Sequence, residues 1–218
     1  MSVTAIIQAR MSSSRLPGKV LKSIRGVPIL LMMIDRAKKS EMIDELVVAT
    51  STDKTDDAIS MSCKRWNIGC FRGSLNDVLD RYYQCAMRGM YYIPGHIVRL
   101  TADCPLIDPK IIDATINTHL NGHYDFTWNP NFPDGLDVEV LTFATLEKGW
   151  EEAKANDERE HVTLYFRRHP ELFRIGRYEN QSDLSKIKVS IDTEEDFERV
   201  SRIIDICVSP DGGICLTQ

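Results

Sequence analysis

Short apolar runs rich in β-branched residues alternate with stretches whose apolar residues recur at helical spacing, and this alternation constrains the fold most strongly. The runs predict strands at residues 3–9, 46–50, 70–71 and 96–101. The stretches between and after them predict helices at residues 28–39, 55–67, 76–88 and 108–120. Strands and helices that alternate in this way form a mainly parallel sheet with helices on both faces. We therefore predict an α/β protein with a three-layer, Rossmann-like arrangement.

The second half of the chain is less regular. We predict a loop-rich stretch at 128–137, strands at 138–142 and 187–191, and helices at 143–154, at 158–168 and from 193 onward. With 218 residues, 43% of them hydrophobic, the chain can bury one sizeable core. We expect one domain at residues 1–208 and a carboxy-terminal tail at 209–218.

Composition and charge argue against several classes of protein. The amino terminus lacks the basic start and apolar stretch of a signal peptide, and no apolar run reaches the roughly 18 residues of a membrane span. We therefore expect a soluble, cytoplasmic protein without a membrane partner. A net charge of −5 argues against nucleic acid as a partner, because nucleic-acid-binding proteins normally carry a basic surplus. Six cysteines without a C-x-x-C pair indicate reduced core thiols.

The first 34 residues contain no Asp or Glu, although the protein as a whole is acidic. They carry five cations, which are Arg10, Arg15, Lys19, Lys22 and Arg25. Positive potential concentrated in one segment indicates a site for an anionic ligand. A solvated basic loop is the alternative.

The segment at 8–19 leaves the first predicted strand with three serines, two arginines, a glycine and a lysine. Guanidiniums bind phosphate oxygens bidentately, and backbone N–H groups in a curved loop point toward them. These side chains and backbone groups are well suited to binding a triphosphate. It is not a Walker A loop, because Ser13 stands where the first glycine belongs and Val20 replaces the metal-binding Ser or Thr.

Two carboxylates follow predicted strands of the sheet. Asp103 comes directly after the strand at 96–101, and Asp192 comes after the strand at 187–191. Ligands of open α/β sheets bind beyond the carboxyl ends of the strands, so we expect both side chains near the basic loop. Helix capping or turn formation is the alternative role for each.

Seven short segments, taken in order, carry a family resemblance. They are IIQAR and RLPGK within 6–19, NDVLDRY at 76–82, TADCPL at 101–106, PDGLDVEV at 133–140, REHV at 159–162 and IDTEED at 191–196. The chain resembles the sugar-activating cytidylyltransferases, the group that contains the 3-deoxy-manno-octulosonate and acylneuraminate enzymes. It is most similar to the branch of the spore-coat polysaccharide biosynthesis protein F.

This resemblance implies a nucleotide-diphospho-sugar transferase fold and a homodimer. It also implies Mg2+-dependent transfer of CMP from CTP to an acidic sugar or similar small acceptor, with release of pyrophosphate, in surface polysaccharide biosynthesis. Asp103 and Asp192 would bind the Mg2+. Arg15, Lys19 and Asp103 would form the catalytic group, in which the cations stabilise charge that grows on phosphate oxygens.

We expect the two substrates to contact different residues. The candidates for the nucleotide are Gln8, Ala9, Arg10, Ser13, Ser14, Gly73 and Ser74. The candidates for the acceptor are Asp134, Asp137, Glu139, Arg159 and His161. Gln8 departs from the wider family, where proline is common. The acceptor candidates have an open alternative, since acidic surface loops and solvated helix faces look similar in sequence.

Two other functions remain open from the sequence. A glycosyltransferase shares this type of fold, but such enzymes usually carry an Asp-x-Asp metal motif, and the chain has a single carboxylate in Ala102-Asp103-Cys104. A nucleotide-binding module without catalytic activity is the second possibility. The sequence leaves the acceptor and the choice among pyrimidine triphosphates undecided.

Overall fold

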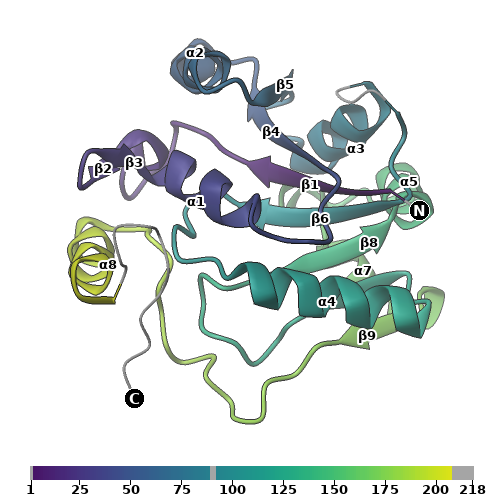
Figure 1. Cartoon of the computed structure of the whole chain (residues 1–218). Coiled ribbons are helices and arrows are strands. Elements are labelled where there is room, and N and C mark those ends of the chain that lie inside the picture. The colour runs from purple at the N-terminus through teal and green to yellow at the C-terminus, as the bar shows by residue number, and fades with distance from the viewer. Residues whose placement is uncertain (1, 89–91, 208–218) are drawn as a thin grey trace.

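The structure is a computed structural model, and it describes residues 2–88 and 92–207. In these residues a seven-stranded sheet has the order β5-β4-β1-β6-β8-β7-β9 (Figure 1). Strands β5, β4, β1 and β6 are parallel to one another. Strand β8 is antiparallel to both of its neighbours, β6 and β7, and β9 pairs with β7 in parallel. The predicted mainly parallel α/β sheet is confirmed.

The strands are β1 Val3–Gln8, β2 Ser23–Ile24, β3 Val27–Pro28, β4 Glu45–Ser51, β5 Gly69–Gly73, β6 His96–Thr101, β7 Phe126–Trp128, β8 Glu139–Thr142 and β9 Ile175–Arg177. The α-helices are α1 Ile29–Ala37, α2 Asp57–Arg65, α3 Val78–Arg88, α4 Pro109–Gly122, α5 Phe143–Glu152, α6 Asn156–Glu160, α7 Leu164–Arg168 and α8 Glu194–Cys207. Short 3-10 turns lie at Lys19–Leu21, Lys54–Asp56 and Pro170–Leu172.

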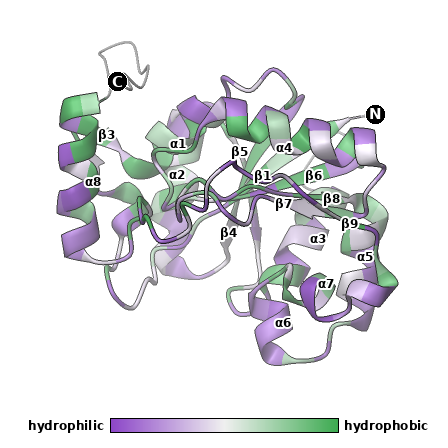
Figure 2. Ribbon diagram, turned by 90° about the horizontal axis from the view of Figure 1, so that it is seen from below, coloured by the Kyte–Doolittle hydropathy of each residue, from purple (hydrophilic) through white to green (hydrophobic). Residues whose placement is uncertain are grey.

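Helices cover both faces of the sheet, as the alternating sequence pattern predicts. Apolar residues of α1, α2 and α4 pack on one face with Ala5 and Ile7 of β1. Apolar residues of α3, α5 and α7 pack on the other face with Ile6. Figure 2 shows these two helical layers on opposite sides of the strands. Because successive side chains of a strand point to opposite faces, β1 contributes to both cores.

The start of α4 follows its sequence signal closely. Asp108 caps the helix by accepting a hydrogen bond from the Lys110 backbone N–H at 2.8 Å, and Pro109 occupies the first turn. The helix ends at Gly122 and is followed by the cap residue His123, which has a left-handed φ of 48°. Among the described residues, no helix has the length and apolar character needed to cross a bilayer.

The single helix predicted at 158–168 is wrong. The structure has two short helices, α6 and α7, separated by a break at Val162, where φ is 36°. Val162 is fully buried in the core beneath α3 and α5, and the Thr163 hydroxyl donates to the buried Glu139 carboxylate at 2.8 Å. These long-range contacts outweigh the local helical pattern.

The strand predicted at 187–191 is also wrong. The segment forms one isolated bridge, between Lys188 and Asp134. Its backbone N–H groups donate instead to two loops, from Val189 and Ser190 to the Asp134 carbonyl and from Ile191 to the Asp103 carbonyl. The segment therefore ties loops together at the edge of the sheet.

A third apolar cluster joins the end of the chain to the first loop. Val200 and Ile204 of α8 pack with Leu16, Ile24 and Ile29. Helix α8 consequently lies beside the β2–β3 hairpin, which the sequence analysis did not anticipate (Figure 1). The predicted tail at 209–218 lies outside the described residues, and the domain boundary stays a prediction.

Candidate active site

A cavity of about 310 Å3 opens at the carboxyl ends of β1 and β6. Twelve of the predicted site residues line it: Gln8, Ala9, Arg10, Ser13, Ser14, Arg15, Lys19, Asp103, Asp134, Asp137, His161 and Asp192. They come from five separate segments of the chain. The cavity therefore brings together the basic loop, both predicted metal ligands and part of the predicted acceptor loop.

The basic loop after β1 is held in a closed shape. The Gly18 N–H donates to the Met11 carbonyl at 2.8 Å, and Gly18 has a φ of +71° that favours glycine. The Met11 N–H donates to Asp56 Oδ1 at 2.7 Å. Asp56 is fully buried, and its other oxygen accepts from the Ser51 N–H at 3.1 Å. Asp56, which sequence reasoning missed, thus anchors the loop to the end of β4.

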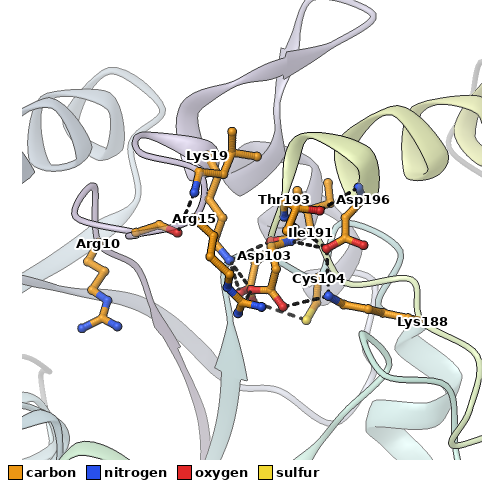
Figure 3. A network of polar contacts seen from close by, with 12 residues as sticks. Arg10, Arg15, Lys19, Asp103, Cys104, Lys188, Ile191, Thr193 and Asp196 are labelled. Atoms are coloured by element: carbon orange, nitrogen blue, oxygen red, sulfur yellow. Dashed lines mark hydrogen bonds and ion pairs between the residues drawn. The ribbon is translucent and has the colours of Figure 1, made fainter.

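Lys19 joins the two predicted metal ligands. Its Nζ lies 2.7 Å from Asp103 Oδ2 and 3.0 Å from Asp192 Oδ1, and it also donates to the Ile191 carbonyl at 2.7 Å. Arg15 Nη2 lies 2.9 Å from the same Asp192 oxygen. Figure 3 shows Arg15 and Lys19 converging on this network, with Arg10 to one side. Lys19 is only 8% exposed, so its charge is largely shielded from water.

A second layer of charges supports Asp192. Lys188 Nζ donates to Asp192 Oδ2 at 2.9 Å and to Asp196 Oδ2 at 2.8 Å. Burial opposes ionisation of Asp196, but hydrogen bonds from Lys188 and Arg199 outweigh it and hold the pKa of Asp196 well below its ordinary value. The sequence pattern identified Asp196 as part of a helix start and gave no sign of its contact with Lys188.

The donor set at Asp103 and Asp192 fits Mg2+. Both are carboxylates, and both direct an oxygen at the point now held by the Lys19 ammonium. Within residues 2–88 and 92–207, no three His, Cys, Asp or Glu side chains converge as a cation site. Mg2+ commonly takes one or two carboxylates and completes its coordination with waters and phosphate oxygens. Asp103 and Asp192 are the residues that would hold such an ion.

The predicted acceptor loop reaches the cavity through Asp134 and Asp137. Gly135 between them has a φ of +107°, and a Cβ there would lie 2.5 Å from the Ser190 backbone nitrogen. The Gly135 N–H donates to Asp137 Oδ2 at 2.9 Å. Burial raises the pKa of Asp137 above its ordinary value. Glycine therefore allows the close approach that carries both carboxylates to the cavity.

Glu139 and Arg159 are engaged elsewhere. Glu139 is buried and forms ion pairs with Arg99 and Arg167. Burial opposes its ionisation, but the two guanidiniums outweigh that effect and hold its pKa below the ordinary value. Arg159 forms a bidentate pair with Asp77 and donates to the Trp150 carbonyl at 2.6 Å. Neither side chain lines the cavity described above, although Arg159 lines a second cavity of about 490 Å3 that shares Arg10 with the first.

The Gly73–Ser74 turn also lies off the cavity lining. The Ser74 hydroxyl accepts from the Asp77 N–H at 3.0 Å, and the Ser74 carbonyl accepts from Arg81 Nη1 at 2.8 Å. The turn thus stabilises the start of α3 and the position of the Arg81 side chain. Arg81 and Arg99 both line the cavity. Sequence reasoning missed both arginines, although a charged residue inside the apolar run HIVRLT was a usable signal for Arg99.

Comparisons with known proteins agree over nearly the whole chain. A profile described as cytidylyltransferase matches residues 4–210. The spore coat polysaccharide biosynthesis protein SpsF of Bacillus subtilis is 36% identical over 205 residues, which are 91% of this chain and 84% of that protein. The solved structure of a cytidylyltransferase from Leptospira borgpetersenii is 38% identical, with a TM-score of 0.90, and covers 96% of this chain and 89% of that one.

A more distant structure shares the fold. CMP:2-keto-3-deoxy-manno-octonic acid synthetase, solved in complex with CTP, has a TM-score of 0.73 at 15% identity and covers 94% of this chain and 99% of its own. The predicted nucleotidyltransferase fold is thereby confirmed. The family profile, the two relatives above 30% identity and the shared architecture show that this chain belongs to the cytidylyltransferase family of nucleotidyl-transferring enzymes.

Proposed function

We propose that this protein transfers CMP from CTP to an acidic sugar or a similar small acceptor and releases pyrophosphate, with Mg2+ as cofactor. The observation that carries the proposal is the position of Lys19, whose ammonium joins Asp103 and Asp192 at the base of a cavity lined by a cationic loop. Cations and carboxylates at one point suit a metal–triphosphate complex.

The basic loop would hold the triphosphate. Arg10, Ser13, Ser14 and Arg15 line the cavity beside Lys19, and all of them can donate hydrogen bonds to phosphate oxygens. Lys19 would exchange its carboxylate partners for a phosphate oxygen when the nucleotide enters. The same loop would then stabilise the negative charge that develops on the leaving pyrophosphate.

The reaction needs no covalent enzyme intermediate. A hydroxyl oxygen of the acceptor attacks the α-phosphorus in line, the new oxygen–phosphorus bond forms, and the bond to the pyrophosphate oxygen breaks. Mg2+, when bound, would neutralise phosphate charge and assist loss of the hydroxyl proton. Arg15 and Lys19 would hold the phosphates in the orientation that this displacement requires.

The choice of substrates is supported by the relatives. The structural neighbour solved with CTP supports CTP as the donor, and the name of the Bacillus subtilis relative supports a role in surface polysaccharide biosynthesis. His161 and the cations of the cavity suit an acceptor that carries an acidic group. Gln8, Ala9 and the Gly73–Ser74 turn remain our prediction for the nucleobase side.

The direct test is pyrophosphate release across four nucleoside triphosphates, each combined with a panel of 2-keto-3-deoxy sugar acids, other acidic sugars and small carboxylated or phosphorylated metabolites. We expect CTP to be preferred and an acidic acceptor to be required. A clear preference for a purine triphosphate would refute the base assignment. Nucleotide binding without pyrophosphate release with any acceptor would favour a non-catalytic module.

A homodimer is expected from the family resemblance, and sedimentation of a monomer at working concentration would contradict it. A cytoplasmic location is expected from the sequence pattern, and fractionation of native cells with an antibody against this protein would test it.

A further inference from the structure

Two arginines in the cavity wall have groups that the protein leaves unsatisfied. Arg81 is 1% exposed and Arg99 is also largely buried, yet both line the cavity. The Nε atoms of both guanidiniums are buried without a hydrogen-bond partner. Burying an unsatisfied donor is unfavourable, more so on a charged group. These two Nε atoms are enclosed by the protein, so contact with a ligand in the cavity falls to the terminal nitrogen atoms of the guanidiniums.

Glu139 fixes the orientation of one of these arginines. Its Oε2 accepts from Arg99 Nη1, while its Oε1 accepts from Thr163 at 2.8 Å and from Arg167 at 2.5 Å. One oxygen thus faces the cavity side and the other faces the start of α7. Glu139 is 5% exposed, so the contact between Glu139 and Arg99 is shielded from water and strong.

Arg99 in turn fixes Gln8. Arg99 Nη2 donates to Gln8 Oε1 at 3.2 Å. Because a guanidinium can only donate, the atom that faces it must be the amide oxygen, and the Gln8 NH2 group is left for other partners. Gln8 lines the cavity at the end of β1. The same part of the wall thus presents donors from an amide and two guanidiniums.

Arg81 is a buried cation without a carboxylate in direct contact in the described part of the chain. Glu139 is shared between Arg99 and Arg167, and among the described residues Arg81 forms no ion pair. Five carboxylates line the cavity, Asp103, Asp134, Asp137, Glu160 and Asp192, and within residues 2–88 and 92–207 none of them forms an ion pair with Arg81 or Arg99. A buried guanidinium without an ion pair favours an anion as its partner.

We propose that Arg81 and Arg99 form a donor subsite that binds an anionic oxygen group of one substrate, and that Glu139 is a positioning residue that orients Arg99 and, through it, Gln8 at the border with the nucleobase side. This inference rests on the proposed function and deepens it. The group is a phosphate of the nucleotide or a carboxylate of the acceptor. Glu139, which the sequence predicts as an acceptor ligand, acts here through Arg99.

The test compares Glu139→Gln with the unmodified enzyme. The variant keeps the side-chain shape and removes the charge that holds Arg99. We expect the affinity for one substrate to fall about tenfold with kcat changed less than threefold, as expected when binding rather than the chemical step is weakened. Two measurements identify the substrate group that binds here. Calorimetry compares the binding of CTP and of cytidine, and steady-state kinetics gives the KM of the acidic acceptor. Weaker CTP binding with unchanged cytidine binding identifies a phosphate, whereas a raised acceptor KM identifies a carboxylate.

The matched control is Arg167→Met, which removes a partner of Oε1 and retains the Arg99 contact to Oε2. We expect it to lower the melting temperature and to leave both substrate affinities within about twofold, because only the α7 side of Glu139 is disturbed. If both variants change stability alike and neither affects substrate affinity, Glu139 is merely structural and the inference fails.

A double-mutant cycle tests the link to Gln8. If Glu139 acts through Arg99 on Gln8, adding Glu139→Gln to Gln8→Ala should weaken binding less than the two single effects combined. Fully additive losses would contradict this link. Should Glu139→Gln fail to fold, Arg81→Gln tests the subsite by the same binding measurements. If the unmodified enzyme releases pyrophosphate and the variants bind both substrates normally, this inference is wrong and the proposed function stands.

Discussion

Lys19 is the residue at which the two predicted metal ligands meet. Its ammonium offsets the repulsion between Asp103 and Asp192, both within 3.0 Å of it. In the proposed reaction, a metal–nucleotide complex would bring its own cation and its own phosphate oxygens. The lysine would then leave the carboxylates to the ion and bind a phosphate, so that charges would stay paired.

Lys19→Ala should impair catalysis and increase the response to the metal. We expect turnover to fall roughly 100-fold or more, because a charge that stabilises the transition state is lost. We also expect Mg2+ alone to raise the melting temperature of the variant more than that of the unmodified protein, since the ammonium no longer competes for Asp103 and Asp192. Pyrophosphate release and thermal shift in an Mg2+ titration measure these effects. If Mg2+ raises the melting temperature of both proteins equally, the Lys19 ammonium and the ion do not compete for the same position.

Asp103→Asn should abolish turnover and preserve the fold. Asp103 is partly exposed, and Lys19 keeps its contacts with Asp192 and the Ile191 carbonyl. We expect a loss of roughly 100- to 1,000-fold in turnover with little change in melting temperature. The variant also tests the metal assignment, because an amide is a poorer Mg2+ ligand than a carboxylate. Near-normal turnover would remove Asp103 from the mechanism.

At the scale of elements, regular periodicity was sufficient to predict the main strands and helices in the first half of the chain. The strand at 96–101 and the capped helix after Asp108 follow their patterns because burial and capping are local signals. The failures at 158–168 and 187–191 have a different cause. Val162 is bent into a core formed by residues distant in sequence, and the second segment bonds to loops at Asp103 and Asp134. A local sequence pattern does not indicate contacts with residues that are distant in sequence.

Helix α6 contains an arginine, Arg159, that was predicted to bind the acceptor but stabilises the fold. Arg159 joins α6 to the start of α3 through Asp77 and to α5 through the Trp150 carbonyl. Arg159→Ala should lower the free energy of unfolding by about 2 kcal/mol, because Asp77 loses a bidentate, charge-assisted partner. Chemical denaturation measures the loss.

Arg202→Ala is the control for this prediction. Arg202 pairs with Glu198 at 3.7 Å, and both side chains are largely exposed, so its removal should cost less than about 1 kcal/mol. Equal losses in the two variants would show that Arg159 does not join these helices in the manner described.

At the scale of the whole molecule, the candidate site depends on chain segments far apart in sequence. Packing of α8 against Leu16 and Ile24 brings Asp192 to the basic loop. The sequence predicted the loop and Asp103 because both follow strands that the structure contains, β1 and β6. The prediction for Asp192 rested on the family resemblance and on a strand at 187–191 that the structure does not contain. The sequence did not predict Arg81 or Asp56, since their roles arise only when α3 and the end of β4 meet the loop.

Stability should depend on pH through a buried histidine pair. His119 is fully buried and makes contacts of 3.1 Å with His96 and 3.0 Å with the Thr127 hydroxyl. Burial lowers the pKa of His119 to about 4, below its ordinary value of 6.5. A histidine with a lowered folded-state pKa stabilises the fold fully above pH 6.5, and this contribution is lost as the pH falls toward 4. The loss is at most about 3 kcal/mol.

Urea unfolding at pH 7.5 and pH 5 measures this dependence. His119→Gln cannot titrate, so the difference between the two pH values should be smaller in the variant than in the unmodified protein. An equal difference in both proteins would show that other groups cause the acid sensitivity.

The central claim is that the loop after β1 binds a triphosphate whose metal is held by Asp103 and Asp192. A crystal structure of the enzyme with CTP and Mg2+ tests it most directly. We predict phosphate oxygens on Arg15 and Lys19, an ion bound by both carboxylates, and Lys19 Nζ moved away from Asp103. A nucleotide bound elsewhere, with Lys19 still joining the two carboxylates, would contradict the account.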